Sequence, residues 1–543
     1  MASIDSIGIA DALFTFTCEG FATDTFLVSR WRGTEEVSRP YRFDLTLACT
    51  DVQLDLERLA GARARFAVQA GGTALTRHGV ITSASQTGMV GDFALYEVVL
   101  EPRLALLRDF RRSDVFLDND IADIIRALLA ECDLTREGRP DDTDCDFVIL
   151  AARTARVPFI CQYEESCLDF LSRRLEREGI YYWFDQHEHG ECLVFGDALA
   201  QQPRQALPLL WRPEADIEPE ARANALTHLE YRVRTSPTSV TLRDFAGSRA
   251  DLDLTVGTTL PARLQHGGAY GNVGDTALYG EHYDTQAEGR RLASIRAEEV
   301  ACRIKRFEGR SLAPGMQAGR SIALSQHFRD DLNAHYYVIA VEHAGSQPLP
   351  AVLPDVPGQG NEYGNRFTAL PADVQFRPAR RTPIPRVTGM IAAVVDAEGS
   401  GQYAEINENG CYKVRFPFAS RRGAPAHNSA WIRKATPYAG TDHGMHLPLL
   451  KGAEVLITFL GGNPDRPVIA AAVTNSENPN RLSTERASQP GLRTAGGNAL
   501  AFEDRVGHQA VVLGSPVEQS HIALGATEQD PSRHGVRLLA QNH

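Results

Sequence analysis

The sequence between residues 447 and 480 reads LPLLKGAEVLITFLGGNPDRPVIAAAVTNSENPN, and it carries most of the information about the fold class. Val455, Ile457 and Phe459 belong to a first predicted strand that is apolar on both faces. The turn GGNPDRP (461–467) ends it, because two glycines permit positive φ and two prolines fix φ and withhold N–H donors. A second strand is predicted for 468–473. An apolar strand that stops so sharply is typical of a small-barrel hairpin whose two faces both need cover.

Residues 13–110 show the pattern of antiparallel strands. In 41–47 (YRFDLTL) and 62–69 (ARARFAVQ), apolar and polar residues alternate, so one face of each strand is expected to enter a core. Glycine-rich turns separate these runs, which favours a barrel or a sandwich. We therefore assign residues 1–110 to a first barrel.

Helical periodicity appears in residues 111–224. Apolar residues at 121, 124, 125, 128 and 129 would share one helical face, with Asp118 or Asn119 as candidate N-cap. A second helix is predicted for about 166–178, begun by Ser166 and ended by Gly179. The segment that follows, 180–195, reads as a hairpin with an aromatic core. Residues 111–224 are therefore interpreted as a helical and hairpin insert.

Residues 225–345 return to strands, with one helix expected near 285–302. Segments 238–245 and 336–341 are predicted to be strands of a second barrel. Eight prolines fall between 348 and 385, so residues 346–385 are predicted to form a stiff connector. Residues 386–480 then hold about five short strands, which fits an OB-fold barrel.

The tail, 481–543, differs from the rest of the chain. Short apolar stretches recur between Gly, Ser, Asp and His residues, at 499–502, 510–513, 521–524 and 536–539. A strand of this kind cannot bury both faces alone, so such repeats gain stability by stacking on neighbouring copies or chains. The alternative is a frayed tail on a monomer.

Composition restricts the possible functions. The 543 residues carry a formal net charge of −13, which disfavours broad nucleic-acid binding. Nine cysteines without a C-x-x-C motif indicate small core residues in a reducing compartment, and neither disulfides nor a zinc site. The first residues lack the basic n-region of a signal peptide, and no apolar run is long enough for a transmembrane helix.

Candidate chemistry is sparse in the sequence. His187 and His189, and His443 and His446, are the close histidine pairs, but they lie in predicted loops without further ligands nearby, so no metal site is predicted. Glu164 and Glu165 precede a helix and are expected to favour its N-terminal dipole. No nucleophile elbow, H-E-x-x-H or P-loop occurs. We therefore predict no catalytic residues, no cofactor and no enzymatic activity.

Several stretches resemble VgrG, the spike protein family of bacterial type VI secretion, which is related to phage tail hubs and spikes. The motifs lie in order along nearly the whole chain. They are FLVSRWRG (26–33), VSRPYRF (37–43), QYEESCLDFL (162–171), EGIYYWF (178–184), DLNAHYYV (331–338), VEH (341–343), NRF (365–367), FRP (376–378), TPIP (382–385), EVLITFL (454–460) and NPDRP (463–467).

The resemblance implies a mainly β protein with a minor helical part. Residues 1–110 and 225–345 would be tube-like hub barrels, 386–480 the OB-fold base of the spike, and 481–543 the start of a trimeric β-helix needle that is short or truncated. It also implies a homotrimer that caps the hexameric Hcp tube, punctures target membranes and carries effectors. Implied partners are a PAAR-type tip protein, effectors with their adaptors, and baseplate proteins, with no nucleic acid. Assembly would occur in the bacterial cytoplasm, followed by injection through the type VI system.

The residues expected to support this assembly come from the hairpin and the tail. In the hairpin they are Val455, Ile457 and Phe459; along the threefold axis of the needle they are Phe502, Val512, Leu513, Ile522 and Leu524. Two other functions stay open at this stage: a cell-wall hydrolase like the phage spike lysozyme, and an OB-type ligand-binding module.

Overall fold

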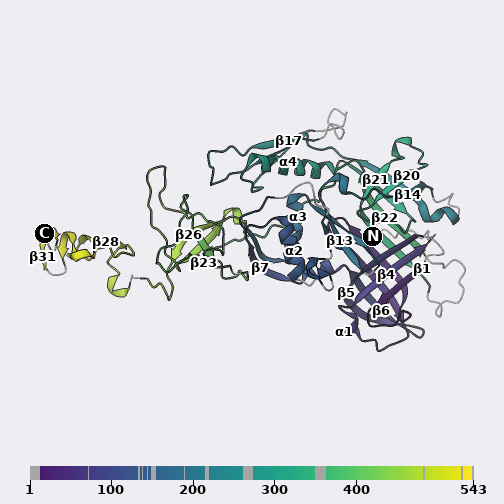
Figure 1. The fold of residues 1–543 in the computed structure, drawn as a ribbon, viewed down its shortest axis with the longest axis horizontal. Helices are drawn as coiled ribbons and strands as arrows, with labels where there is room; N and C mark the ends of the chain where they lie inside the picture. The colour runs from purple at the N-terminus through teal and green to yellow at the C-terminus, as the bar shows by residue number, and fades with distance from the viewer. Residues whose placement is uncertain are drawn as a thin grey trace. The chain divides into compact units, whose positions relative to one another are not determined.

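The structure of the protein is a computed structural model. It describes residues 13–70, 73–131, 135–136, 139–143, 145–147, 155–188, 190–213, 219–260, 273–348, 362–421, 423–480, 483–527 and 530–540. These residues form two compact units. The first contains residues 1–389, 418–431 and 459–467, and the second contains 390–417, 432–458 and 468–543. The fold is mainly β with a minor helical part (Figure 1).

A twelve-stranded sheet dominates the first unit. Its N-terminal half has the order β1-β4-β5-β6-β3-β2, with every pair antiparallel. The strands are β1 (Leu13–Cys18), β2 (Leu27–Glu36), β3 (Arg42–Cys49), β4 (Arg63–Ala70), β5 (Thr73–Val90) and β6 (Phe93–Glu101). A short helix, α1 (Leu56–Leu59), precedes β4. The two alternating segments of the sequence are thus strands β3 and β4, as predicted.

Aromatic side chains fill the core of this half. Trp31 on β2 meets Phe66 edge-on at 4.8 Å between ring centroids and stacks on Tyr363 at 5.9 Å. Phe14 and Phe43 pack on the same indole. Because side chains alternate across each strand, these rings share one face while charged residues such as Arg65 lie on the other.

The C-terminal half of the sheet is a closed six-stranded barrel. Its order is β21-β20-β14-β15-β19-β22, and a further pairing of β21 with β22 closes the ring. The strands are β14 (Ala206–Trp211), β15 (Ala225–Val233), β19 (Lys305–Ser311), β20 (Ser321–Ser325), β21 (His335–Ser346) and β22 (Glu362–Pro371). Strand β2 pairs with β21, so one ladder joins the two halves.

Two strands of this barrel lie outside the range in which the sequence placed it. β14 falls within the predicted insert, and β22 falls within the predicted connector. The only proline of β22 is its last residue, Pro371, so the proline-rich composition around it does not interrupt its ladder. The predicted strand 336–341 is part of β21, in the barrel as expected.

The predicted strand 238–245 exists but does not belong to the barrel. It is β16 (Ser239–Arg243), the centre of a separate three-stranded sheet with β17 (Val256–Thr259) and β18 (Asp275–Tyr279). Helix α4 (Gln286–Ala301) packs on this sheet, and its buried Leu292 shares a cluster with Val240 and Leu242. Alternation predicts which face of a strand is buried, but not which sheet the strand joins.

The helices agree with their sequence signals. α2 (Ile121–Glu131) buries the predicted apolar face, and α3 (Cys167–Glu178) is capped by Ser166 and ended by Gly179 in the left-handed region at φ 70°. The cap of α2 was predicted wrongly. Its side-chain acceptor is Asp120, whose Oδ1 lies 2.8 Å from the Asp123 amide, and neither Asp118 nor Asn119 is that acceptor.

Smaller sheets surround these helices. β7 (Arg111–Phe116) pairs with β11 (Ile160–Ser166), and β12 (Tyr181–Gln186) pairs with β13 (Glu191–Gly196) as the predicted aromatic hairpin. β10 (Cys145–Phe147) adds to β13, while β8 (Thr135–Arg136) and β9 (Arg139–Thr143) form a two-stranded ladder. No helix among the described ranges is long and apolar enough to cross a membrane.

The second compact unit is built on two sheets. The first has the order β24-β23-β25-β26, with β23 (Ile391–Asp396), β24 (Lys413–Arg415), β25 (Glu454–Phe459) and β26 (Pro467–Val473). The second is an antiparallel meander, β27 (Gly491–Arg493), β28 (Ala499–Glu503), β29 (Ala510–Gly514), β30 (His521–Thr527) and β31 (Asp530–Leu539). Four apolar stretches of the tail are thus strands of one sheet.

Candidate functional site

Large apolar side chains form two rows along one face of the C-terminal meander. Strand register pairs Leu500 with Leu513, and Leu513 with Ile522. Residues paired across a ladder point to the same side of the sheet, so each row continues from strand to strand. The rows together, here called the apolar ladder, consist of Leu500, Phe502, Val511, Leu513, Ile522, Leu524, Val536 and Leu538.

The apolar ladder is largely open to solvent in a single chain. Leu513 is 55% exposed and Leu524 is 44% exposed, and Val511 is half-buried. A contiguous apolar face of this kind marks a surface that another polypeptide covers, whereas isolated exposed apolar residues need no explanation. The ladder is therefore the leading candidate for an assembly surface.

Four of the five needle residues predicted from the sequence lie on the ladder. Phe502, Leu513, Ile522 and Leu524 share its face, but Val512 points to the opposite face, where it pairs with Ala501 and Ala523. Adjacent residues of a strand cannot face the same side, so Val512 and Leu513 cannot both reach one axis. The sequence analysis missed Leu500, Val511, Val536 and Leu538, which alternation within each stretch could have identified.

The three predicted hairpin residues are interior. Val455 and Ile457 are fully buried and Phe459 is 5% exposed. The residues between them, Leu456 among them, are half-buried, so β25 alternates instead of being buried equally on both faces as predicted. These three side chains consequently stabilise the sheet, and within one chain they present no surface to a partner.

The NPDRP turn (463–467) makes buried polar contacts within the first compact unit. The Cys161 amide donates to Asp465 Oδ1 at 2.8 Å, and Arg174 Nη1 donates to Asp465 Oδ2 at 3.0 Å. Arg466 Nη2 donates to the Phe245 carbonyl at 2.8 Å, and its guanidinium lies 3.5 Å from Asp244. Each charged side chain of the turn therefore has a partner, as a buried ion requires.

Helix α3 supplies a row of arginines to this region. Arg173 binds Glu165 through Nε and Nη2, at 2.8 and 2.7 Å. Burial raises the pKa of Glu178, but Arg177, Arg291 and Arg174 outweigh it and bring that pKa down to about 2. Glu165 thus belongs to a buried ion pair with Arg173, which the sequence analysis did not predict.

His282 is a titratable side chain in direct contact with the turn. Its imidazole Nε2 meets the Asn463 side-chain amide. Burial, and then the neighbouring Arg466, lowers the pKa of His282 to about 4. The imidazole is consequently neutral near pH 7, and protonation there would put a second positive charge beside Arg466.

A second buried ion pair sits where the two halves of the large sheet meet. Arg77 Nε donates to Glu35 Oε1 at 3.0 Å, and His343 Nε2 lies 3.2 Å from the same oxygen. The other nitrogen of His343, Nδ1, lies 3.0 Å from the Tyr363 hydroxyl. These four side chains connect β2, β5, β21 and β22. The VEH motif, which ends at His343, therefore has a structural role in holding these strands together.

The two close histidine pairs of the sequence are His187 with His189 and His443 with His446. No group of three or more His, Cys, Asp or Glu with metal-binding geometry is found in the described part of the chain. His187 lies in the exposed turn of the β12–β13 hairpin, and His189 falls outside the described residues. Tyr181, Tyr182 and Trp183 are buried, as expected for hairpin core.

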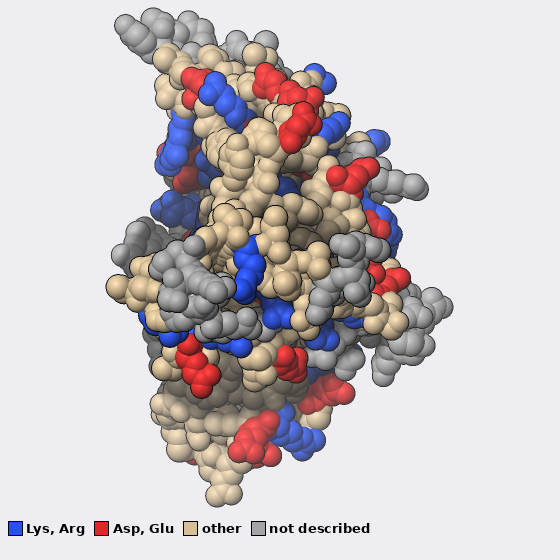
Figure 2. Space-filling model, turned by 90° about the vertical axis from the view of Figure 1, so that its left-hand side faces the viewer, with Lys and Arg blue, Asp and Glu red and all other residues tan. Residues whose placement is uncertain are grey.

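Charges of both signs are interspersed over the described residues of the face shown in Figure 2. On that face, basic side chains are accompanied by acidic ones. This mixture differs from the continuous basic surface with which proteins bind a phosphate backbone.

Two ranges of the chain match known protein families. Residues 34–349 match the phage tail baseplate hub (GPD) family, and residues 407–473 match the type VI secretion system/phage-baseplate injector OB domain. The first match includes most strands of the twelve-stranded sheet, and the second includes β24, β25 and β26. The class defined by fold and family is therefore a phage-tail-like baseplate hub joined to an injector OB domain.

Curated relatives narrow this class. The chain is 29% identical over 503 residues to the type VI secretion system spike protein VgrG1b of Pseudomonas aeruginosa, covering 90% of this chain and 65% of that protein. It is 30% identical to VgrG5 of the same organism, covering 92% of this chain and 63% of that protein. The chain thus spans slightly less than two thirds of these relatives. It belongs to the phage tail baseplate hub (GPD) family and is similar over most of its length to VgrG spike proteins.

A solved structure supports the fold. The Escherichia coli c3393 protein, a component of the type VI secretion system with structural similarity to the T4 bacteriophage tail proteins gp27 and gp5, matches with a TM-score of 0.60. The match has 23% identity and covers 84% of this chain and 99% of that chain.

Proposed function

We propose that the protein is the structural spike of a type VI secretion system and works as a homotrimer. The observation that carries the proposal is the apolar ladder, a solvent-exposed face that spans four successive strands of the C-terminal meander. Three copies would bury their ladders around a common axis. A closed threefold arrangement satisfies identical surfaces without leaving one uncovered.

The energetics favour association. Full burial of a large aliphatic side chain contributes roughly 1.5–3 kcal/mol. The eight ladder side chains of each chain can therefore offset the roughly 4–15 kcal/mol lost in translational and rotational freedom on association. The resulting prism would be stiff, because the ladder of each meander would pack against the ladders of the two other chains.

The remaining parts of the role follow from family membership. The hub half would cap the hexameric Hcp tube and contact baseplate proteins, and the far end of the needle would bind a PAAR-type tip protein. Effectors and their adaptors would be carried on the assembly, which forms in the bacterial cytoplasm and is injected by the system to puncture target membranes. The division into hub, insert, connector, OB base and needle is part of this proposal, with β14 and β22 assigned to the second hub barrel.

The role proposed is mechanical, without catalysis or a cofactor. Relatives bear the name of spike proteins. Incubation of the purified protein with peptidoglycan should release no soluble muropeptides. Release that a single carboxylate substitution abolishes would establish the hydrolase alternative and overturn this part of the proposal.

The trimer is tested by Leu524→Asp. The change places a carboxylate in the centre of the ladder, where burial of an unpaired charge opposes association. Native mass spectrometry of the wild-type protein should give three times the chain mass of 59.5 kDa, and the variant should give single chains.

Arg537→Asp is the matched control. Arg537 lies on the opposite face, paired with Ala523, and is exposed, so the same aspartate there should leave the trimer intact. A wild-type chain that stays monomeric at micromolar concentration, or a trimer that tolerates Leu524→Asp, would contradict the proposal.

A further inference from the structure

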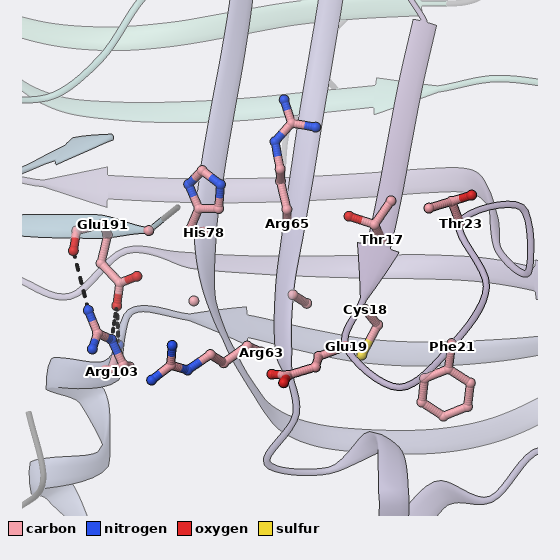
Figure 3. A pocket seen from close by; sticks show the side chains of 13 residues that line it. Thr17, Cys18, Glu19, Phe21, Thr23, Arg63, Arg65, His78, Arg103 and Glu191 are labelled. Carbon is pink, nitrogen blue, oxygen red and sulfur yellow. Dashed lines mark hydrogen bonds and ion pairs between the residues drawn. The ribbon is translucent and has the colours of Figure 1, made fainter. Parts of the chain in front are cut away.

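A pocket of about 340 Å³ opens on the outer face of the N-terminal half of the large sheet (Figure 3). Its floor and sides come from β1, β4 and β5, from the loop after β1, and from Arg103 and Glu191. The volume lies at the lower end of the roughly 300–1,000 Å³ typical of ligand pockets. Three of its lining side chains are arginines, so it is called here the arginine pocket.

Strand register creates the upper row of the pocket. Thr17 on β1 pairs with Arg65 on β4, and Arg65 pairs with His78 on β5. Cross-strand partners share a face, so a hydroxyl, a guanidinium and an imidazole stand side by side, as Figure 3 shows. Arg63 lies two residues before Arg65 on β4 and therefore on the same face.

The walls of the pocket are held in place by hydrogen bonds. His78 is 9% exposed, and its backbone amide and Nδ1 lie 2.9 and 3.2 Å from the Gln186 Oε1. Arg103 donates from its backbone amide and its Nε to Glu191 Oε1, each at 3.0 Å. The Glu19 amide donates to the Arg63 carbonyl at 2.8 Å. A preorganised pocket loses little entropy when a ligand binds.

The pocket holds unused donors beside unused acceptors. Arg63 and Arg65 are exposed and form no ion pair within the described ranges, whereas Arg103 is neutralised by Glu191. Because Nδ1 of His78 faces an acceptor oxygen, its Nε2 is the acceptor of the neutral ring. Burial, partly opposed by Gln186, lowers the pKa of His78, which keeps the ring neutral. The Glu19 carboxylate is a further acceptor.

This combination selects the chemistry of the ligand. Two unpaired guanidinium groups favour a carboxylate, which each of them can bind with paired N–H donors. A neutral imidazole and a carboxylate require donors from the same ligand. A phosphate offers oxygen acceptors and would meet Glu19 and Glu191 at close range, whereas a peptide offers backbone N–H donors together with acidic side chains.

We infer that the arginine pocket is a docking site for an acidic segment of a partner polypeptide, whose carboxylate is bound by Arg63 and Arg65. Every lining residue belongs to one chain. The inference therefore rests on residues of a single chain and does not depend on the proposed function.

The test uses the full chain and a fluorescein-labelled hexapeptide of glutamate residues. Fluorescence anisotropy at low ionic strength should show saturable binding, because screening weakens such contacts as salt is added. The double variant Arg63→Gln, Arg65→Gln should bind the peptide at least about tenfold more weakly. Both residues are exposed, so the variant should keep its fold, which circular dichroism checks.

Three controls test whether binding is specific for the arginine pocket and for an acidic peptide. Arg32→Gln removes an exposed arginine of β2 that does not line the pocket, and it should leave affinity unchanged. A hexapeptide of glutamine residues should not bind. Inorganic phosphate should not displace the acidic peptide at equal concentration. Equal peptide binding by the double variant, equal binding of the glutamine peptide, or displacement by phosphate would each overturn the inference.

Discussion

At the residue scale, the NPDRP turn shows how a short polar motif can be fixed by buried charges. Asp465 accepts from the Cys161 amide and from Arg174, so its carboxylate is neutralised inside the protein. Asn463 contacts His282, and Arg466 approaches Asp244. Removing one partner of such a set leaves an uncompensated charge, which costs more than the set contributes in total. The charges of Asp465 and Arg466 are therefore required by their buried partners. The backbone geometry that the prolines of the motif impose is only part of its role.

His282 makes the stability of this region depend on pH. Its pKa of about 4 in the folded protein lies below the ordinary value near 6.5, so the unfolded chain binds more protons between these values. The contribution of the neutral His282 to the free energy of unfolding is therefore fully present above pH 6.5, and it is lost as the pH drops towards 4. Urea titrations of the wild type should show a loss attributable to His282 of about 3 kcal/mol at pH 4.

His282→Gln should remove that part of the pH dependence. His187→Gln is the matched control, because His187 lies in an exposed hairpin turn and its replacement should leave the wild-type slope between pH 6.5 and 4 unchanged. If His282→Gln keeps the full wild-type slope, the imidazole is not the group that responds.

At the element scale, β25 is a strand with one fully buried face, whose apolar side chains anchor it in the core. Val455 and Ile457 are fully buried, while the residues between them are half-buried. Ile457 pairs with Ile391 on β23, so its side chain lies against a neighbouring strand as well as in the core. A polar replacement at this position consequently cannot escape to solvent without breaking the ladder.

Ile457→Asp should destabilise the four-stranded sheet by roughly 3–5 kcal/mol, because it buries an unpaired carboxylate. Thr458→Asp is the control, since its side chain points to the other, half-buried face and should cost much less. Chemical denaturation monitored by circular dichroism compares the two. Equal costs would mean that β25 does not have the register described.

The elements also show what could be predicted from the sequence. α3 was predictable with its cap and its terminating glycine, because these signals are local. The membership of β16 in a separate sheet was not, since alternation contains no information about the partner strand. The same limit applies to the ion pair of Glu35 and Arg77, whose members lie on β2 and β5, two strands that β6 and β3 separate in the sheet.

For the assembly surface, the sequence predicted the location and part of the composition. The apolar stretches of the tail identified Phe502, Leu513, Ile522 and Leu524, all of which lie on the ladder. Val512 was included because it is apolar and adjacent. Alternation within each stretch would have separated it from Leu513 and added Leu538, whereas strand register was needed to show that these residues form continuous rows. The arginine pocket was missed, because its residues come from segments that are remote in the sequence.

At the scale of the whole molecule, association through the apolar ladder would make the free energy of unfolding depend on the concentration of the chain. A ligand or partner that binds only the folded form stabilises it by mass action, and for a homotrimer the partner is the chain itself. A hundredfold rise in chain concentration changes the stability of a trimer by about 1.8 kcal/mol per chain. The C-terminal meander, whose apolar face lies open in one chain, should respond most strongly.

Differential scanning calorimetry at about 1 and 100 µM should therefore show a transition of the wild-type meander that rises by a few degrees with concentration. Leu524→Asp should abolish the rise, because the carboxylate prevents the ladders from meeting, while Arg537→Asp on the opposite face should preserve it. A wild-type transition independent of concentration would mean that the meander is stable as a single chain. In that case the exposed ladder would need another partner, and self-association would not account for it.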